Sequence, residues 1–570
     1  MFNKIKDIFY NYKYLLNSKF HLSKKHLLLL FLISSISLIF SFVVIFSSIP
    51  FLDLMLGNNP SEYQIPTKYL INILDKLNLE GTFFIFSSLF ILSIILKSVC
   101  DVLYGYYAIS LQFEFMGQET LNLNKIIFGM SQRFYIKHST SKIFNLYTRE
   151  LERASEVISS LMLAVNAFLQ IIIFIVIPIY LNTKFTIIFL VLIIILLSPL
   201  LIVNYLSIKQ GFIATIVSDN LFKSLNNNFL YSKFISIHGL IIKANSLFLE
   251  SYNKYVKNKK KLTLLSGISG NFIQPIGIFT IVITVFFVIG KVDNLPIIGG
   301  ILWSLTRTLN PINIILQALN TISSQIGAFK NIYETKNNFK SFKIQNGNFL
   351  IDKFQKLSFN NIVFKYDDKL VLDNLSLEIK NGEKIAILGE TGSGKSTLLD
   401  IITNVTNLTH GNRKINDVNY EEIDFQEFRK KISYVPQSLT LLDANIREYF
   451  EFYNYNIDDK KINDLLDFFN CTEFLGNSPT RVDYYLGDKG IKLSGGQKQK
   501  IILAAALSRN PELLLLDETT NAIDRYEEQK ILTKILNQNI TLVFISHKLQ
   551  NKELFDKIIK IENKKLIKLK

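Results

Sequence analysis

Cysteine, tryptophan and histidine are scarce in this chain of 570 residues, which contains two, one and six of them. Cys100 lies inside an apolar stretch, and Cys471 lies in the more polar second half. Two cysteines so far apart in such different contexts offer neither a disulfide framework nor a CxxC metal site. We therefore expect both to be small core residues.

Acidic residues are also outnumbered, with 47 Asp and Glu against 63 Lys and Arg, which gives a net charge of +16. A basic protein can bind nucleic acid, but that function requires a basic stripe on a folded surface. Here the lysines gather beside apolar stretches, as in membrane proteins whose cytoplasmic segments carry the positive charge. The pattern favours a membrane protein with no nucleic-acid partner.

Six apolar stretches are long enough to cross a bilayer, which requires about 20 residues in a helix. The first is too long for a cleavable signal peptide, so we expect it to remain in the protein. Tight turns join the third stretch to the fourth and the fifth to the sixth, whereas long connections follow the second and the fourth. The predicted spans are Leu27–Phe51, Thr82–Ala108, Leu161–Leu181, Phe185–Leu206, Phe272–Ile289 and Leu295–Ile322.

Basic residues mark one side of these predicted spans. They gather ahead of the first span and in the two long connections, whereas the segment between the first and second spans is acidic on balance. The positive-inside rule then places both termini and both long connections in the cytoplasm. We expect a multi-pass protein of the plasma (inner) membrane whose soluble half is cytoplasmic.

The two long connections combine polar composition with helical periodicity, so we expect the spanning helices to continue into the cytoplasm. Their tips, near His138–Tyr147 and Lys223–Ile235, would then contact the soluble domain. The alternative is two solvated helical hairpins without a partner.

The second half reads as a soluble α/β domain. From Leu357 the sequence alternates strands, glycine-bearing turns and amphipathic helices, which is typical of a mostly parallel sheet. Residues 327–355, which are charged and rich in Asn and Lys, are expected to link a membrane domain (1–326) to this domain (356–570). The predicted fold is an α-helical membrane domain of six transmembrane helices followed by an α/β domain.

A phosphate-binding loop of the form GxxxxGKS follows the apolar strand Ile385–Leu388. In such a loop, backbone N–H groups and a helix N-terminus face phosphate oxygens, while the lysine neutralises their charge and the serine reaches Mg²⁺. The sequence therefore predicts ATP and Mg²⁺ as cofactors, and we expect the α/β domain to be a P-loop ATPase domain. The predicted phosphate-binding residues are Gly389, Glu390, Thr391, Gly392, Ser393, Gly394, Lys395 and Ser396, with Thr397 next to them.

Four polar side chains follow other predicted strands. Asp517 and Glu518 end the apolar run at 513–516, and in this arrangement the first acid holds Mg²⁺ and the second polarises the attacking water. Gln437 is placed to sense the γ-phosphate or the metal, and His547 ends the strand at 541–545. An acidic pair after a strand is otherwise a helix N-cap, and a single histidine is otherwise structural.

The order and spacing of these motifs resemble the nucleotide-binding domain of ATP-binding cassette (ABC) transporters. The resemblance implies that Tyr366 stacks on adenine, that Gln437 belongs to the Q-loop and is also a Mg²⁺ ligand with Ser396 and Asp517, and that His547 is the switch histidine. It also implies that Asp524 is the acid of the D-loop. The family's signature motif, which binds the ATP of the other subunit, corresponds here to Leu493, Ser494, Gly495, Gly496 and Gln497.

A split site of this kind requires a dimer. Because every catalytic position matches the active pattern, we expect a homodimer, with pairing to a sister chain as the alternative. The six spans ahead of the cassette and the segment Tyr485–Gly490, which resembles the X-loop of exporters, indicate a type IV exporter that works by alternating access. Asp488 stands in this segment where the family usually has Glu.

Polar residues inside the spans are the candidates for substrate contact, since they are costly in a bilayer. Lys97 and Asp101 are spaced i, i+4, so they either pair with each other or face a cavity. Arg307 either lines that cavity and meets an anionic group or neutralises an acid on another helix.

Lys97 and Arg307, together with Ile49–Phe51, also resemble positions of bacterial flippases for lipid-linked oligosaccharides. We therefore expect an amphipathic or lipid-linked substrate. The alternatives are a peptide, bacteriocin or multidrug exporter and, in another class, an ATP-gated channel or regulator.

Overall fold

The chain folds into two compact units in the computed structural model. The helical unit comprises Met1–Phe128 and His138–Ser341, and the α/β unit comprises Gly129–Lys137 and Phe342–Lys570. The structure describes residues 23–55, 65–76, 83–137, 140–288, 295–339, 342–437, 441–476, 480–519, 523–547 and 552–570.

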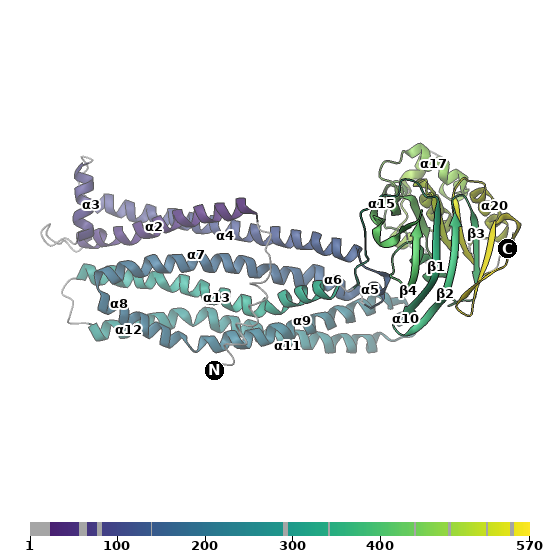
Figure 1. The fold of residues 1–570 in the computed structure, drawn as a ribbon. Coiled ribbons are helices and arrows are strands. Elements are labelled where there is room, and N and C mark those ends of the chain that lie inside the picture. The colour runs from purple at the N-terminus through teal and green to yellow at the C-terminus, as the bar shows by residue number, and fades with distance from the viewer. Residues whose placement is uncertain are drawn as a thin grey trace. The chain divides into compact units, whose positions relative to one another are not determined.

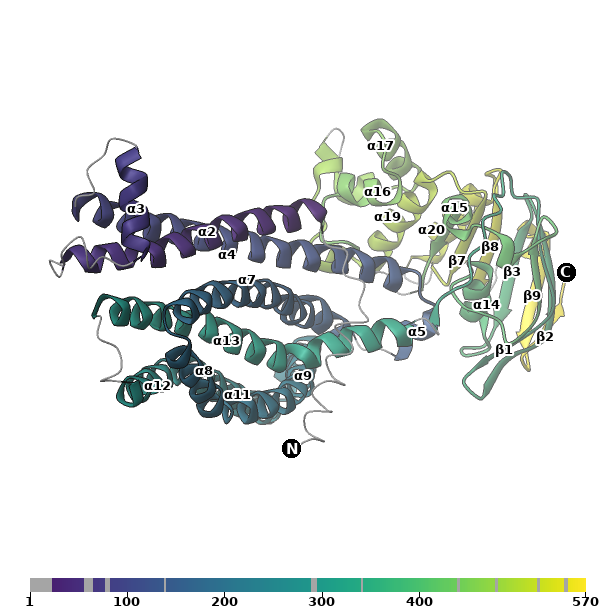
Figure 2. The same ribbon diagram turned by 60° about the vertical axis from the view of Figure 1, so that its left-hand side comes forward.

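The helical unit consists of long helices that run alongside one another (Figures 1 and 2). Helix α13 packs against α7 and α9, and α2 packs against α4. The helices are α2 (Lys24–Met55), α3 (Ile65–Lys76), α4 (Phe83–Phe128), α6 (Thr140–Asn145), α7 (Leu151–Leu181), α8 (Thr183–Leu197), α9 (Leu200–Leu230), α10 (Ser232–Ile237), α11 (Ile241–Asn271), α12 (Ile273–Val288) and α13 (Leu295–Phe339), with a π-helical turn at Leu146–Glu150.

Five helical segments of the described chain are long and apolar enough to cross a membrane, and each overlaps one of the first five predicted spans. The predicted ends at Thr82 and Ile289 lie outside the described residues. The sixth predicted span lies in α13, whose apolar run is interrupted by polar residues such as Arg307 and Asn310. Helix α13 continues through Gly327 to Phe339, so the first part of segment 327–355 is helical. Helices α4 and α9 extend well beyond the predicted spans, and α11 occupies the connection directly ahead of the fifth predicted span, as the periodicity of the long connections predicts.

Two glycines allow α9 and α13 to cross closely. A Cβ atom on Gly211 would overlap the backbone carbonyl oxygen of Ser324, and one on Gly327 would lie 2.9 Å from the carbonyl oxygen of Gly211. Beside this crossing, Arg153 of α7 donates to the carbonyl oxygens of Gly211 and Ser324 at 3.5 and 3.2 Å. The same guanidinium pairs with the buried Glu150 at 3.1 Å, so three helices are joined at one point.

The α/β unit contains two sheets with the cores packed around them. The first sheet is antiparallel in the order β2-β1-β4-β5, and the second has the order β10-β9-β3-β8-β7-β6, in which β9, β3, β8, β7 and β6 are parallel. The strands are β1 (Lys356–Tyr366), β2 (Lys369–Lys380), β3 (Lys384–Gly389), β4 (His410–Ile415), β5 (Val418–Asn419), β6 (Ile432–Val435), β7 (Leu513–Asp517), β8 (Thr541–Ser546), β9 (Lys557–Glu562) and β10 (Lys565–Lys568).

Helices cover the parallel strands, and Figure 2 shows α14 beside β3. Strands β7 and β8 are buried along their whole length, which explains why they read as continuous apolar runs. The helices of this unit are α5 (Gln132–Lys137), α14 (Lys395–Ile402), α15 (Phe425–Phe428), α16 (Ile446–Tyr453), α17 (Asp459–Phe468), α18 (Thr472–Leu475), α19 (Gly495–Ser508) and α20 (Arg525–Leu536).

A short piece of the first long connection, Gly129–Lys137, folds with the α/β unit. Met130 forms a bridge with Lys343, and the N–H of Gln132 donates to the carbonyl oxygen of Val405 at 2.7 Å. Phe134 is fully buried in this unit. This piece lies immediately ahead of the range 138–147 in which the sequence predicted a contact with the soluble domain.

Candidate functional site

The phosphate loop connects β3 to α14, as the GxxxxGKS motif predicts. Gly392 and Gly394 have φ angles of 82° and 102°, which side-chain-bearing residues rarely adopt. A Cβ atom on Gly394 would also lie 2.8 Å from Leu372. Lys395, the first residue of α14, donates to the carbonyl oxygens of Gly389 and Glu390 at 2.9 Å each. The lysine side chain is therefore held by hydrogen bonds to the first two residues of its own loop.

The carboxyl ends of β3, β7 and β8 meet at one edge of the sheet because these strands are parallel neighbours. Glu518 lies at this edge and is 7% exposed. Its Oε1 is 2.7 Å from Nε2 of His547 and 3.6 Å from Nζ of Lys395, and its Oε2 accepts from Nε2 of Gln437 at 2.7 Å. The structure thus gathers the three residues predicted as catalytic beside the lysine of the phosphate loop.

The backbone at Glu518 has a φ angle of 51°, a region that residues other than glycine rarely occupy. The N–H of Glu518 donates to the carbonyl oxygen of Ile545 at 3.1 Å, which ties the turn after β7 to β8. Conformations of this kind persist where the surroundings hold them, and they are frequent at active sites. The unusual backbone aims the carboxylate at His547.

Asp517 and Ser396 provide oxygen atoms suited to Mg²⁺. The Asp517 side chain is 2% exposed, Ser396 hydrogen-bonds to it, and burial, together with the charge of Glu518, raises its pKa. Its Oδ1 is buried and has no hydrogen-bond partner within the described residues. Because Mg²⁺ prefers oxygen ligands and keeps several waters, an unused carboxylate oxygen beside a hydroxyl fits this ion. The amide nitrogen of Gln437, the third predicted ligand, is engaged by Glu518.

Tyr366, predicted to stack on adenine, ends β1 and is half-buried. It packs edge-to-face on Phe364 with ring centroids 4.8 Å apart. Thr397 hydrogen-bonds to the Tyr366 hydroxyl, and burial raises the pKa of that group. The aromatic residue therefore lies next to the helix that follows the phosphate loop.

The signature residues form the N-terminus of α19. Ser494 caps the helix by accepting from the N–H of Gln497 at 3.3 Å, and the Gln497 side chain accepts from the N–H of Ser494 at 2.9 Å. Ser494 and Gly495 are exposed, whereas Leu493 is buried. Asp524 precedes α20, is exposed, and makes no capping bond with its side chain. Both motifs are thus presented on the surface.

The two candidate substrate residues lie in different environments of the helical unit. Lys97 is ion-paired with Asp101, whose other oxygen accepts from Ser37 at 2.8 Å and Gln170 at 3.0 Å. This network favours the structural role for Lys97. Arg307 lies over the ring of Trp303 at 4.5 Å and forms no ion pair among the residues that the structure describes.

Two residues near the site were missed by sequence reasoning. The Tyr434 hydroxyl donates to Oδ2 of Asp517 at 3.4 Å, and burial with the charge of Asp517 raises the pKa of Asp400 to about 7. Asp400 stands four residues after Ser396 in a helix, so helical spacing alone places both on one face. No sequence signal pointed to Tyr434, which precedes Gln437 in an apolar strand.

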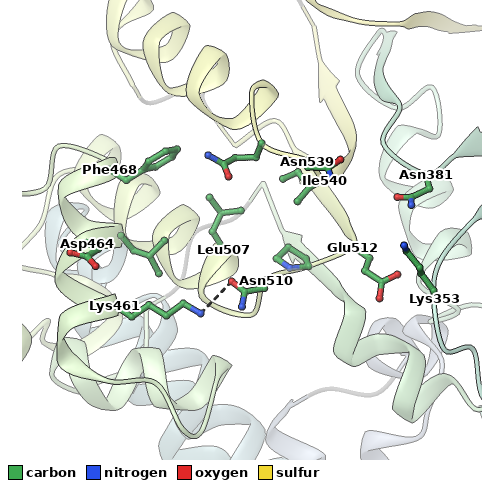
Figure 3. A pocket seen from close by; sticks show the side chains of 13 residues that line it. Lys353, Asn381, Lys461, Asp464, Phe468, Leu507, Asn510, Glu512, Asn539 and Ile540 are labelled. Atoms are coloured by element: carbon green, nitrogen blue, oxygen red, sulfur yellow. Dashed lines mark hydrogen bonds between the residues drawn. The ribbon is translucent and has the colours of Figure 1, made fainter.

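A cavity of about 630 Å³ lies elsewhere in the α/β unit (Figure 3). Its lining includes Asn381, Glu512 and Ile540, which stand just before β3, β7 and β8. These are the amino ends of the parallel strands, opposite the edge that holds the phosphate loop. The cavity is therefore separate from the candidate nucleotide site.

Residues 372–521 match the family model described as ABC transporter. The chain carries an ABC transporter domain. This ABC domain includes the phosphate loop, Gln437, the signature residues and Glu518, and the neighbouring Tyr366 and His547 complete the arrangement described above.

The heterocyst differentiation ATP-binding protein of Nostoc sp. is 28% identical over 319 residues, which cover 55% of this chain and 52% of that protein. The ATP-dependent lipid A-core flippase of Coxiella burnetii is 25% identical over 448 residues, which cover 76% and 75%. The chain spans about half the length of several curated relatives that it matches.

A solved structure of a bacterial Atm1-family ABC exporter with ATP bound superposes with a TM-score of 0.78. The match covers 95% of each chain at 18% sequence identity, so it establishes the fold. The fold that the two chains share is a helical unit fused to an ABC domain.

Proposed function

We propose that this chain is one half of an ATP-hydrolysing membrane exporter or flippase that works as a dimer by alternating access. The observation that carries the proposal is the position of Glu518 between His547, Gln437 and Lys395, next to the phosphate loop. An ATP-binding protein that only senses nucleotide does not need a carboxylate placed in this way. The helical unit supplies the membrane part.

In the proposed reaction, Glu518 accepts a proton from the water that attacks the γ-phosphate, and Lys395 stabilises the phosphate charge. Ser396 and Asp517 would hold Mg²⁺, which neutralises the charge of the β- and γ-phosphates when bound. Both oxygens of Glu518 are engaged by His547 and Gln437, and Lys395 is engaged by the loop carbonyls. We infer that, when nucleotide binds, Lys395 exchanges the loop carbonyls for the phosphates, and Glu518 becomes able to accept a hydrogen bond from the attacking water.

The proposed dimer follows from the signature residues. Ser494 and Gly495 are exposed at the start of a helix whose N–H groups suit a phosphate, and the family resemblance assigns that phosphate to the partner's ATP. The tip formed by α10 and the adjoining ends of α9 and α11 also favours a dimer, because large apolar side chains are exposed there. Phe229, Phe234, Ile237 and Ile242 are between 53% and 85% exposed. An apolar tip on a polar loop is typical of a docking surface. We propose that it docks on the α/β unit of the partner.

Transport then requires the two nucleotides to drive a change of shape. Moving a two-state equilibrium from 1:99 to 99:1 takes about 5.5 kcal/mol of differential binding. In the proposed cycle, two nucleotides enclosed between phosphate loops and signature helices supply that energy. Hydrolysis would return the helical units to the first state.

Substrate class rests on Arg307. Its guanidinium is half-buried in a helix of the helical unit, it stacks on Trp303, and Lys97 is already neutralised by Asp101. Arg307 pairs with no acid in the described part of the chain, and such a cation in a membrane helix is a functional-site hypothesis by default. Together with the flippase among the relatives, this favours an amphipathic or lipid-linked substrate with an anionic head group, such as a lipid-linked oligosaccharide. A peptide or multidrug exporter is the second candidate, favoured by the same general architecture.

We place the protein in the plasma (inner) membrane. The basic residues gather on the side of the predicted spans that carries the termini and the α/β unit, and the positive-inside rule assigns that side to the cytoplasm.

The most direct test of the proposed function is the ATPase activity of the purified protein in lipid nanodiscs, with and without lipid-linked glycans or peptides. We expect activity that one of the two classes stimulates. Absence of Mg²⁺-dependent ATP hydrolysis in every lipid tested would refute the proposal.

Replacing Glu518, the proposed general base, provides the second part of the test. Glu518→Gln should abolish turnover while ATP binding and the closed dimer remain, and Glu553→Gln, a change of the same kind at an exposed position, should leave turnover unchanged. Turnover that survives in Glu518→Gln would show that another group acts as base. Translocation of a fluorescent lipid-linked glycan into the outer leaflet would establish direction.

A further inference from the structure

The piece Gly129–Lys137 reaches the end of β1, where the predicted adenine-stacking residue stands. The Arg133 guanidinium lies 5.3 Å from the ring centroid of Phe364 and 5.9 Å from that of Tyr366. The same guanidinium donates a hydrogen bond to the carbonyl oxygen of Lys365, the residue between the two rings. Arg133 therefore holds three consecutive residues at the end of the strand.

The position of Arg133 is fixed by its neighbours in the piece. On one side, the N–H of Gln132 donates to the carbonyl oxygen of Val405 at 2.7 Å. On the other side, Phe134 is fully buried and packs edge-to-face on Phe342 with centroids 6.0 Å apart. With a backbone bond before it and a buried ring after it, Arg133 has little freedom to leave the two rings.

Arg133 also retains an unused donor. Its Nε is buried and has no hydrogen-bond partner within the described residues. A guanidinium prefers the face of an aromatic ring because the ring carries negative charge there. A stacked arginine cannot be replaced by lysine without loss, since the ammonium group lacks the planar face.

We propose that Arg133 is a positioning residue of the nucleotide site, which fixes the Tyr366 ring for stacking on adenine. The proposal rests on the function proposed above, because it needs Tyr366 to bind the base. It makes affinity for ATP depend on a piece of chain that is covalently continuous with α4. The effect concerns the base and not the phosphates, which are bound by the loop at 389–396.

The test separates base binding from phosphate binding. Displacement of a fluorescent ATP analogue from the purified full-length protein by ATP and by inorganic triphosphate, both with Mg²⁺, gives the two affinities. For Arg133→Ala we expect affinity for ATP to fall about 5- to 10-fold, within the range of base stacking on an aromatic, while affinity for triphosphate stays within twofold. The maximal rate of ATP hydrolysis should remain near that of the wild type when ATP is saturating.

Lys137→Ala is the matched control on the same piece. Lys137 pairs with Asp367 at 3.0 Å, but both side chains are at least half exposed, and surface pairs contribute little. We expect its ATP affinity to be unchanged. In the Tyr366→Ala background, Arg133→Ala should have no further effect, because the ring that it positions is gone.

The outcomes are distinguishable. Wild-type protein that binds no ATP would refute the proposed function itself. In a wild type that binds ATP, unchanged ATP affinity in Arg133→Ala would overturn only the role of Arg133. Unchanged ATP affinity in Tyr366→Ala would overturn the adenine-stacking role of Tyr366 and, with it, the role of Arg133. If Arg133→Ala also loses affinity for triphosphate, the Arg133→Lys variant is measured instead. Weaker affinity of that variant for ATP, with its affinity for triphosphate retained, supports the proposal. Unchanged affinity for ATP overturns it.

Discussion

Glu518 Oε1 and His547 Nε2 lie 2.7 Å apart, although the two residues end different strands. The contact exists because β7 and β8 are parallel neighbours whose carboxyl ends share one edge of the sheet. The positive φ angle at Glu518 turns its side chain along that edge toward the histidine. The orientation of the Glu518 carboxylate therefore depends on His547.

Replacing His547 by alanine removes the group that orients the Glu518 carboxylate. We expect the maximal rate of ATP hydrolysis to fall about 100- to 10,000-fold, the usual range for a group in acid–base catalysis, with ATP affinity changed less than tenfold. Steady-state ATPase assays and nucleotide titration of the purified protein measure the two quantities. Unchanged hydrolysis would assign His547 a structural role.

Lys500 of α19 and Glu527 of α20 form an ion pair in which the lysine is almost fully buried. Lys500→Met leaves a partly buried carboxylate, and removing one partner of a buried pair costs about 3 to 5 kcal/mol. We expect a lower midpoint of thermal unfolding for the single variant and partial recovery for Lys500→Met with Glu527→Leu. A double variant less stable than either single variant would show that the two changes act independently.

Gly211→Val should disrupt the crossing of α9 and α13. The added Cβ atom would overlap the backbone carbonyl oxygen of Ser324, which cannot move as a flexible side chain could. We expect poor recovery of folded protein in detergent, measured by size-exclusion chromatography. Gly105→Val is the control, because a Cβ atom there meets nothing within 4 Å. Equal recovery of both variants would contradict the close crossing.

Asp400 makes the stability of the nucleotide-free α/β unit depend on pH. Burial and the charge of Asp517 raise its pKa from 3.8 to about 7, so the folded state prefers the protonated form. The folded state therefore binds more protons than the unfolded state between these two pKa values, and stability falls as pH rises through that window. Asp400→Asn removes the ionisable group.

We expect Asp400→Asn to raise the midpoint of thermal unfolding at pH 8 by several degrees and to raise it clearly less at pH 5. The gain is largest at pH 8 because the whole window between the two pKa values has then been crossed, whereas at pH 5 only its lower part has been. Differential scanning fluorimetry without nucleotide measures both conditions. An equal shift at the two pH values would show that ionisation of Asp400 is not the cause.

Much of the ABC domain could be predicted because its chemistry is local in sequence. The phosphate loop requires glycine at 392 and 394, where φ is positive, and a lysine at 395. Buried parallel strands require the apolar runs before Gly389 and Asp517. The pairing of Lys97 with Asp101 was likewise one of two readings that helical spacing allowed.

The remaining features depend on tertiary packing. Arg133 is one of several basic residues in its connection, and only the folded chain shows that it lies on Phe364 and Tyr366. The φ angle of Glu518 and the bond from Tyr434 to Asp517 arise from neighbouring strands that are distant in sequence. The length of α13 was underestimated because its helical period continues through a charged, asparagine-rich stretch.

The membership of Gly129–Lys137 in the α/β unit also sets an order of events during biosynthesis. This piece leaves the ribosome before the helices of His138–Ser341 and before Phe342, on which Phe134 packs. Domains generally fold as they emerge, from the N-terminus onward. Here the early piece has to wait for its partners. Phe342, the end of β1 and Val405 are made only after the whole helical segment His138–Ser341 has been translated, so docking of the piece reports that this segment is complete.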